Sequence, residues 1–194
     1  MVRVDTPHIA LSEELFLRVV RENPELRLER SREGRLIVVP PTGGEGSRAN
    51  AEITGQLRDW NRVSAGGVVF DSSGGFRLPN GATRSADAAW LPSSRWLQLD
   101  QTERQSFPPL CPEFVIELLS PSDDLTETRA KLDEFVQNGA QLGWLIGPLS
   151  RTVEIYRPHH APELLKDPQT VQGEGVLLSF VLDLGPVFDD PTTA

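Results

Sequence analysis

The chain has 194 residues, of which 38% are hydrophobic and 24% are charged, a composition typical of a globular protein with a full core. Its net charge of −9 and pI near 4.9 argue against an affinity for nucleic acid that comes from broad neutralisation of phosphates. No apolar run approaches the roughly 20 residues needed to span a bilayer, so we expect no membrane partner. No glycine- or serine-rich linker divides the chain, and we expect residues 1–194 to form one domain.

Cysteine usage and the N-terminus bear on the compartment. Cys111 is the one cysteine in the sequence, so an internal disulfide cannot form, which fits a reducing environment. Residues 1–7 lack the charged and then apolar layout of a signal peptide. We therefore expect a cytoplasmic protein. No motif frames Cys111, and we interpret it as a structural thiol.

The first segment predicts a helix followed by a hairpin. Ser12 precedes two glutamates and an apolar face, so it is expected to cap a helix that ends at Asn23 and Pro24. Residues 26–29 and 35–39 then flank a polar turn and predict a β-hairpin. Four arginines gather on this hairpin: Arg27, Arg30, Arg32 and Arg35. They are either a solvated hairpin tip or a finger that contacts phosphates.

A second helix is expected over residues 49–60, with Ser47 as its cap, because Ile53, Leu57 and Trp60 recur at helical spacing. The glycine loop before it lacks the Gly-Lys-Ser/Thr ending of a phosphate-binding loop, so nucleotide binding is not supported. Glu52 lies near the start of this helix. It is either a surface residue stabilised by the helix dipole or a side chain that points to an active site.

The middle of the chain predicts an antiparallel meander. Residues 68–70 and 76–78 read as strands, and the turn at residues 79–81 leads into a short apolar run that carries Asp87. Residues 93–109 are expected to be a loop with a short helical piece.

The second half predicts a strand, a helix and a parallel strand. The apolar run 114–120 carries Glu117, the helix over residues 125–138 has the apolar stripe Leu125, Leu132, Phe135 and Val136, and residues 143–147 form the second strand. A crossover of this kind makes its two strands parallel. Residues 152–156 follow as an alternating strand.

Asp87 and Glu117 are the residues most suggestive of chemistry, because each places a carboxylate inside a short apolar strand. Burying such charges is costly unless a nearby cation compensates them. If the two strands are neighbours, their carboxylates would also repel each other, which increases the need for a cation. Two hard oxygen ligands, completed by waters and a substrate phosphate, suit Mg²⁺ or Mn²⁺. Zinc fits poorly, because His8, His159 and His160 show no Cys/His ligand spacing.

Lys131 follows Glu117 by one loop and about a turn and a half of helix, beside the apolar stripe, so its amine can reach the sheet edge. With a metal bound, a nearby lysine could orient the attacking water and offset negative charge. In the alternative interpretation, Asp87 and Glu117 lie at strand ends and pair with arginines such as Arg84 and Arg129.

Three segments resemble a known family: Arg84-Ser85-Ala86-Asp87-Ala88-Ala89-Trp90; Cys111-Pro112-Glu113-Phe114-Val115-Ile116-Glu117-Leu118-Leu119-Ser120-Pro121-Ser122-Asp123; and Lys131 with Asn138-Gly139-Ala140 and Trp144-Leu145-Ile146-Gly147-Pro148. Together they resemble the Uma-two family of restriction endonuclease-like proteins, in the PD-(D/E)XK nuclease superfamily. The resemblance implies an α/β fold with a restriction-endonuclease-like mixed β-sheet core flanked by helices, with antiparallel hairpin additions. It also implies that Asp87 and Glu117 are metal ligands and that Glu52 lies on a helix that often adds a third acidic group.

The sequence departs from the family pattern at three positions. Ala86 stands where the family usually has proline, and Gly147 stands where many members have aspartate. Leu119 occupies the position two after the glutamate, where the superfamily normally has its lysine. Either Lys131, on the following helix, replaces that lysine, or the site lacks one of the residues needed for catalysis.

Two main hypotheses follow. In the first, the protein is a magnesium- or manganese-dependent endonuclease that hydrolyses DNA. Asp87 and Glu117 would be the metal ligands, Lys131 would position or activate the attacking water, and Glu52 would assist. In the second, suggested by Leu119 and the net charge, it is a catalytically silent nuclease fold that serves as a binding module. An enzyme that acts on another phosphorylated substrate is a third interpretation. Cutting two strands favours two sites, which makes a homodimer an expectation of the first hypothesis.

Overall fold

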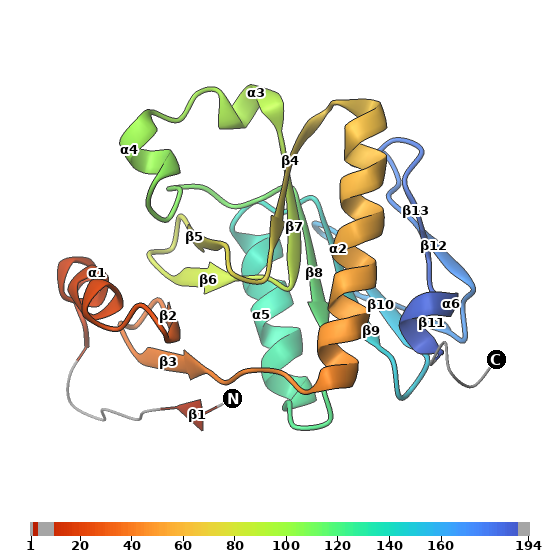
Figure 1. Cartoon of the computed structure of the whole chain (residues 1–194), viewed down its shortest axis with the longest axis horizontal. Helices are drawn as coiled ribbons and strands as arrows, with labels where there is room; N and C mark the ends of the chain where they lie inside the picture. The colour runs from red at the N-terminus through yellow and green to blue at the C-terminus, as the bar shows by residue number, and fades with distance from the viewer. Residues whose placement is uncertain (1, 4–9, 190–194) are drawn as a thin grey trace.

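A mixed six-stranded sheet forms the centre of the computed structural model, which describes residues 2–3 and 10–189 (Figure 1). The strand order is β11-β10-β9-β8-β7-β4. β8 and β9 are parallel, and the other neighbours pair antiparallel. The strands are β4 (Gly67–Asp71), β7 (Ala88–Pro92), β8 (Phe114–Leu118), β9 (Leu142–Gly147), β10 (Thr152–Tyr156) and β11 (Glu163–Lys166).

A second, five-stranded sheet lies beside the first at the N-terminal end of the chain, with the order β1-β3-β2-β6-β5. Its members are β1 (Val2–Arg3), β2 (Arg27–Arg30), β3 (Leu36–Val39), β5 (Gly75–Arg77) and β6 (Thr83–Ser85). The predicted hairpin is confirmed as the antiparallel pair β2 and β3. A third pair, β12 (Thr170–Gln172) and β13 (Val181–Asp183), lies near the C-terminal end.

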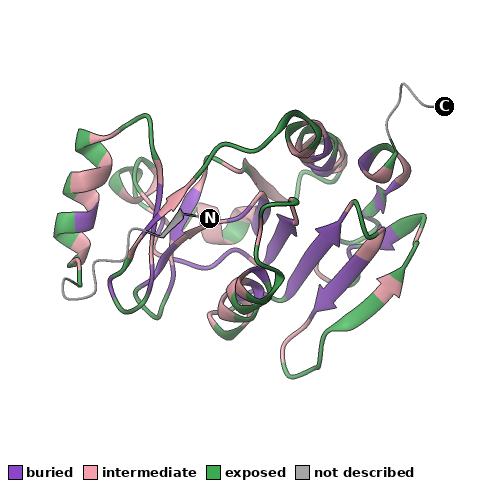
Figure 2. Ribbon diagram, turned by 90° about the horizontal axis from the view of Figure 1, so that it is seen from below, coloured by how far each residue is buried: buried purple, intermediate pink, exposed green. Residues whose placement is uncertain are grey.

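Two long helices cover opposite faces of the six-stranded sheet, as the view nearly along their axes shows (Figure 2). α2 (Gly44–Ser64) buries Ala49, Ile53 and Leu57 on one face, and α5 (Leu125–Gln137) buries Leu132 and Phe135 on the other. The remaining helices are α1 (Glu13–Glu22), α3 (Ser93–Trp96), α4 (Gln101–Arg104) and α6 (Gly185–Phe188). The predicted mixed α/β core with flanking helices and hairpin additions is therefore confirmed.

Residues of β8 alternate between these two faces, as the period of a strand requires. Phe114, Ile116 and Leu118 contact the α2 side, whereas Val115 lies in the core on the α5 side. Glu117, between Ile116 and Leu118, therefore also faces α5. This alternation determines which helix can supply a partner to the Glu117 carboxylate.

Helix boundaries depart from the expectation in α2 and agree in α1. Ser12 caps α1 by accepting a hydrogen bond from the Leu15 amide at 3.2 Å, as predicted. The cap predicted at Ser47 is wrong, because α2 begins at Gly44 with Gly43 at the N-cap. The Ser47 amide already donates to the Gly43 carbonyl at 2.9 Å, which places Ser47 inside the first turn.

The predicted meander is wrong in its connectivity. β4 pairs with β7 in the large sheet, whereas β5 and β6, which lie between them in the chain, form a hairpin in the small sheet. Asp87 therefore does not lie in the middle of a strand. It occupies the bend between β6 and β7, where the chain passes from the small sheet to the large one.

Two details of burial also differ from the sequence pattern. Leu125 was expected in the apolar stripe of α5, but it is the first residue of the helix and is 37% exposed. The strand β10 was expected to alternate, yet four of its five residues are buried, because it lies inside the sheet between β9 and β11. Among the described helices, none combines the length and apolar character needed to cross a membrane.

Candidate active site

Asp87 is held beside Glu117 by two backbone hydrogen bonds across the β7–β8 pair. The Asp87 amide donates to the Ile116 carbonyl at 3.0 Å, and Asp87 Oδ2 accepts from the Leu118 amide at 2.8 Å. These two anchors lie on either side of Glu117 in the chain. The fold thus brings together the two carboxylates that the sequence selected, although they are far apart along the chain.

Lys131 reaches the same place from α5. Its ammonium Nζ lies 2.9 Å from Glu117 Oε1 and 3.1 Å from Oε2, and it donates a hydrogen bond to Oε2. Glu117 Oε1 is buried and accepts no hydrogen bond from the described residues. The predicted approach of Lys131 to the sheet is therefore observed, and its ammonium lies within ion-pair distance of both oxygens of Glu117.

Glu29 joins this cluster, although the sequence pattern did not single it out. It lies on β2, is 1% exposed, and its Oε1 is 3.2 Å from Lys131 Nζ. Arg84 and the Ser85 amide also donate to the Glu29 carboxylate, each at 3.2 Å. The available signal was weaker than at Glu117, because Glu29 ends a predicted strand that also carries Arg27, whereas Glu117 lies within an apolar run. We refer to Glu29, Asp87, Glu117 and Lys131 as the carboxylate–lysine cluster.

The three carboxylates of the cluster differ in electrostatic state. Burial raises the pKa of Glu117 to about 8, against the opposing charge of Lys131, and burial likewise raises the pKa of Asp87. Glu29 is buried too, but the charges of Lys131 and Arg84 overcome this effect and lower its pKa. Burial opposes the charge of Lys131, yet the surrounding carboxylates raise its pKa. Asp87 and Glu117 are thus the two carboxylates that lack sufficient cationic compensation.

The interpretation in which arginines neutralise Asp87 and Glu117 is not what the structure shows. Arg84 pairs with Glu29 at 3.2 Å and with Glu134 at 2.6 Å. Arg129 pairs with Glu154 on β10. Both arginines named in that interpretation are therefore engaged by other glutamates.

Comparison with known proteins identifies the family. A family model named Uma2 and described as "Putative restriction endonuclease" matches residues 13–185, which is most of the chain. The chain belongs to the Uma2 family. The resemblance predicted from the sequence motifs is confirmed. No curated protein matches.

The fold of this Uma2 chain also occurs in solved structures. One is described as a putative nuclease belonging to DUF820 from Anabaena variabilis. It superimposes with a TM-score of 0.72 and 22% sequence identity, and the match covers 84% of this chain and 90% of the other. At this level of identity the likeness concerns the fold.

The structure shows the surroundings of the three positions at which the sequence departs from the Uma2 pattern, Leu119, Gly147 and Ala86. Leu119 follows β8 and packs against the buried side chains on the α5 face, so it supplies no cation to Glu117. Lys131 provides the ammonium at that carboxylate instead. At Gly147, an added Cβ would lie 2.5 Å from Ser150 Oγ, so the hydroxyl would have to shift to admit an aspartate. Ala86 is buried beside Asp87.

Glu52 is not brought to the carboxylate–lysine cluster. It is exposed on α2, and α2 covers the face of the sheet opposite to the one that Glu117 and Lys131 occupy. Its assisting role stays a prediction, and the proposed function does not depend on it.

Cys111 is buried with its Sγ 3.3 Å from the Phe135 carbonyl, and burial raises its thiol pKa to about 12. Both features agree with a structural thiol.

The donor set at Asp87 and Glu117 fits a hard divalent cation. Within the described residues, no group of three or more His, Cys, Asp or Glu side chains is arranged to hold a metal ion. Mg²⁺ is commonly bound by one or two carboxylates, with waters and substrate phosphates as the other ligands. The Glu117 carboxylate, whose Oε1 accepts no hydrogen bond from the described part of the chain although Lys131 Nζ lies 2.9 Å away, and the half-buried Asp87 meet that smaller requirement. His8 lies outside the described residues.

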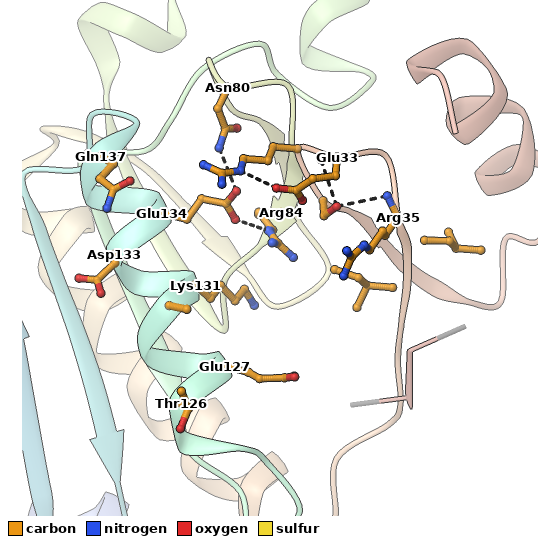
Figure 3. A pocket seen from close by; sticks show the side chains of 15 residues that line it. Glu33, Arg35, Asn80, Arg84, Thr126, Glu127, Lys131, Asp133, Glu134 and Gln137 are labelled. Carbon is orange, nitrogen blue, oxygen red and sulfur yellow. Dashed lines mark hydrogen bonds and ion pairs between the residues drawn. The ribbon is translucent and has the colours of Figure 1, made fainter. Parts of the chain in front are cut away.

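A pocket of about 490 Å³ opens between the β2–β3 hairpin and α5 (Figure 3). Lys131 lines it, whereas Asp87 and Glu117 are not part of its wall. Charged side chains dominate the rest of the lining: Arg32, Glu33, Arg35, Arg84, Glu127, Asp133 and Glu134. The pocket therefore meets the carboxylate–lysine cluster at Lys131.

Proposed function

We propose that this Uma2 protein is a divalent-metal-dependent nuclease that hydrolyses phosphodiester bonds of DNA. The observation that carries the proposal is the placement of two undercompensated carboxylates, Asp87 and Glu117, side by side next to the Lys131 ammonium. The description of the Uma2 family as a restriction endonuclease and that of the Anabaena variabilis protein as a nuclease support the same reaction class.

Asp87 and Glu117 would hold the metal ion. A bound Mg²⁺ or Mn²⁺ supplies Lewis-acid polarisation of a phosphodiester and lowers the pKa of water at its site. The protein contributes two buried oxygens whose desolvation a divalent cation would offset. Glu29 would remain the fixed partner of Lys131 and Arg84, since its carboxylate already receives three donors.

Lys131 would position the attacking water and stabilise negative charge on the phosphate. Its ammonium has three donors, and the carboxylates of Glu117 and Glu29 use two of the directions around it. A third donor can face a substrate oxygen on the pocket side, where Lys131 lines the cavity. This arrangement supports the substitution of the family lysine by Lys131, with Leu119 as a packing residue.

The decisive experiment compares plasmid nicking by the wild-type protein and by Asp87→Ala in the presence of Mg²⁺. We expect the wild-type protein to nick the plasmid and Asp87→Ala and the EDTA control to leave it intact. Asp59→Ala is a matched control, because Asp59 is exposed on α2, on the far face of the sheet. Equal nicking by the wild-type and Asp87→Ala proteins would end the proposal.

A catalytically silent binding module is the competing function, and the direct contact between Lys131 and Glu117 favours it if that contact excludes a metal ion. Calorimetric titration with Mg²⁺ separates the two functions. Binding that disappears in Glu117→Gln supports the nuclease, whereas no binding to the wild-type protein supports the silent module. A homodimer and a cytoplasmic location stay predictions.

A further inference from the structure

The four arginines of the β2–β3 hairpin have different partners. Arg30 donates to two backbone carbonyls, those of Leu11 at 2.7 Å and Gly81 at 2.5 Å, so its charge serves to fasten the hairpin. Arg32 is paired with Glu33 at 2.6 Å. The side chains of Arg27 and Arg35 form no hydrogen bond or ion pair within residues 10–189. Two of the four arginines are therefore available to an external anion.

Strand register places Arg27 and Arg35 on the face of the hairpin that covers α5. Arg27 and Glu29 are two residues apart on β2, so their side chains leave the same face, and Glu29 contacts Lys131 on that face. Ile37, which pairs with Glu29 across the hairpin, lines the pocket, and so does Arg35 two residues earlier. The two arginines thus lie on the same face, with the Glu29–Lys131 contact between them.

Arg35 projects into the pocket. Its side chain is exposed and extends from the hairpin toward α5 and Arg84 (Figure 3). Several acids line the same pocket, but Glu33 is paired with Arg32 and Glu134 with Arg84, each at 2.6 Å. Asp133 points away from the hairpin, whereas Glu127 is on the side of α5 that faces it. The hairpin wall of the pocket is therefore basic at Arg35.

Arg27 lies at the other end of the row, on the side of Glu29 away from Arg35. It is half-buried at the start of β2, and its charge, like that of Lys131, acts against the effect of burial on the pKa of Asp87. Arg27 and the Arg35 end of the hairpin are separated by about four residues of strand, roughly 13 Å. That separation suits contacts on either side of a reacting group.

We propose that a DNA strand passes between the β2–β3 hairpin and α5, and that Arg27 and Arg35 bind its phosphates on the two sides of the carboxylate–lysine cluster. This inference rests on the proposed nuclease function and names the residues that position its substrate. It also reconciles DNA binding with the net charge of −9, because the binding surface is confined to one face of one hairpin and needs no basic surface elsewhere.

The experiment measures binding of a short fluorescently labelled DNA duplex by anisotropy over a series of salt concentrations, in EDTA so that the DNA stays intact. We expect Arg27→Gln and Arg35→Gln each to weaken binding about tenfold and to reduce the magnitude of the salt slope by about 0.9. Arg58→Gln is the matched control, because it removes the same charge from an exposed site on α2. It should bind as the wild-type protein does.

Charge-preserving variants separate a binding role from a folding role. Arg27→Lys and Arg35→Lys should restore the salt slope, and circular dichroism should show that all variants are folded. Equal affinity and equal slope for the wild-type, Arg27→Gln and Arg35→Gln proteins would overturn the inference, as would a wild-type protein that does not bind DNA. Plasmid nicking by Asp87→Ala tests the proposed function separately: if it nicks normally while the arginine variants lose binding, the reaction mechanism fails and the phosphate path stands.

Discussion

Two glutamates of the central sheet occupy nearly equivalent positions and differ in the hydrogen-bond donors and cations that contact their carboxylates. Glu117 on β8 and Glu154 on β10 both pair with Leu145 of β9, from its two sides. They are 6% and 8% exposed, and each is met by a basic residue of α5. The solvent-exposed fractions of the two residues are therefore similar.

The difference lies in the hydrogen bonds. Both oxygens of Glu154 accept from Arg129, at 3.1 and 3.0 Å, and Tyr156 donates to Oε2 at 2.9 Å. The Arg129 hydrogen bonds lower the pKa of Glu154. Glu117 has one lysine, shared with Glu29, and its pKa is raised to about 8 by burial. Glu154 thus forms a structural ion pair with Arg129 in which both carboxylate oxygens accept hydrogen bonds. Glu117 has too few donors to form an equivalent pair.

The largest expected effect comes from exchanging each glutamate for its amide. Glu117→Gln should abolish Mg²⁺ binding and reduce cleavage at least about 100-fold, and at pH 7 its free energy of unfolding should be no lower than that of the wild-type protein. Glu154→Gln should lower the free energy of unfolding by about 1–2 kcal/mol, because Arg129 is half exposed and solvent screens the pair, and it should cut normally. Calorimetry, nicking assays and denaturant titration measure these effects. Loss of cleavage in Glu154→Gln and not in Glu117→Gln would reverse the assignment.

The two basic residues of α5 that contact these glutamates should also differ, with Lys131 needed for cleavage and Arg129 for stability. Lys131→Gln should slow cleavage about 100-fold while Mg²⁺ binding, which depends on the carboxylates, is retained. Arg129→Gln should leave the cleavage rate unchanged and lower stability. Single-turnover cleavage at saturating Mg²⁺ gives the rates, and calorimetry gives the metal affinity. A Lys131→Gln protein that cleaves at the wild-type rate would remove Lys131 from the proposed mechanism.

The last comparison concerns the pH dependence of stability in the metal-free protein. The pKa of Glu117 is about 8 in the folded state and near 4.5 when unfolded. A raised pKa favours the folded state below pH 4.5, and this contribution is lost as the pH rises through 8. The wild-type protein should therefore lose up to about 1.4 kcal/mol per pH unit relative to Glu117→Gln in this window. Glu154→Gln should keep the wild-type slope between pH 6 and 8, because Glu154 stays ionised there.

The sequence alone determined the main elements and the three residues that meet in the candidate site. Local periodicity and capping located α1, the β2–β3 hairpin, β8, α5 and β9, because these signals depend on residues within a few positions of one another. A carboxylate within a short apolar segment pointed to Asp87 and Glu117, and helical spacing pointed to Lys131. The family resemblance rested on the same segments.

The way in which distant segments combine could be seen only in the folded chain. The tertiary structure assigned β5 and β6 to a separate sheet, placed Glu52 on the far face, and added Glu29 to the cluster. It also distinguished Glu117 from Glu154, which look alike as glutamates within buried strands. The physical reason is that the energy of a buried charge depends on the donors around it in space, and those donors come from parts of the chain that local sequence patterns do not relate.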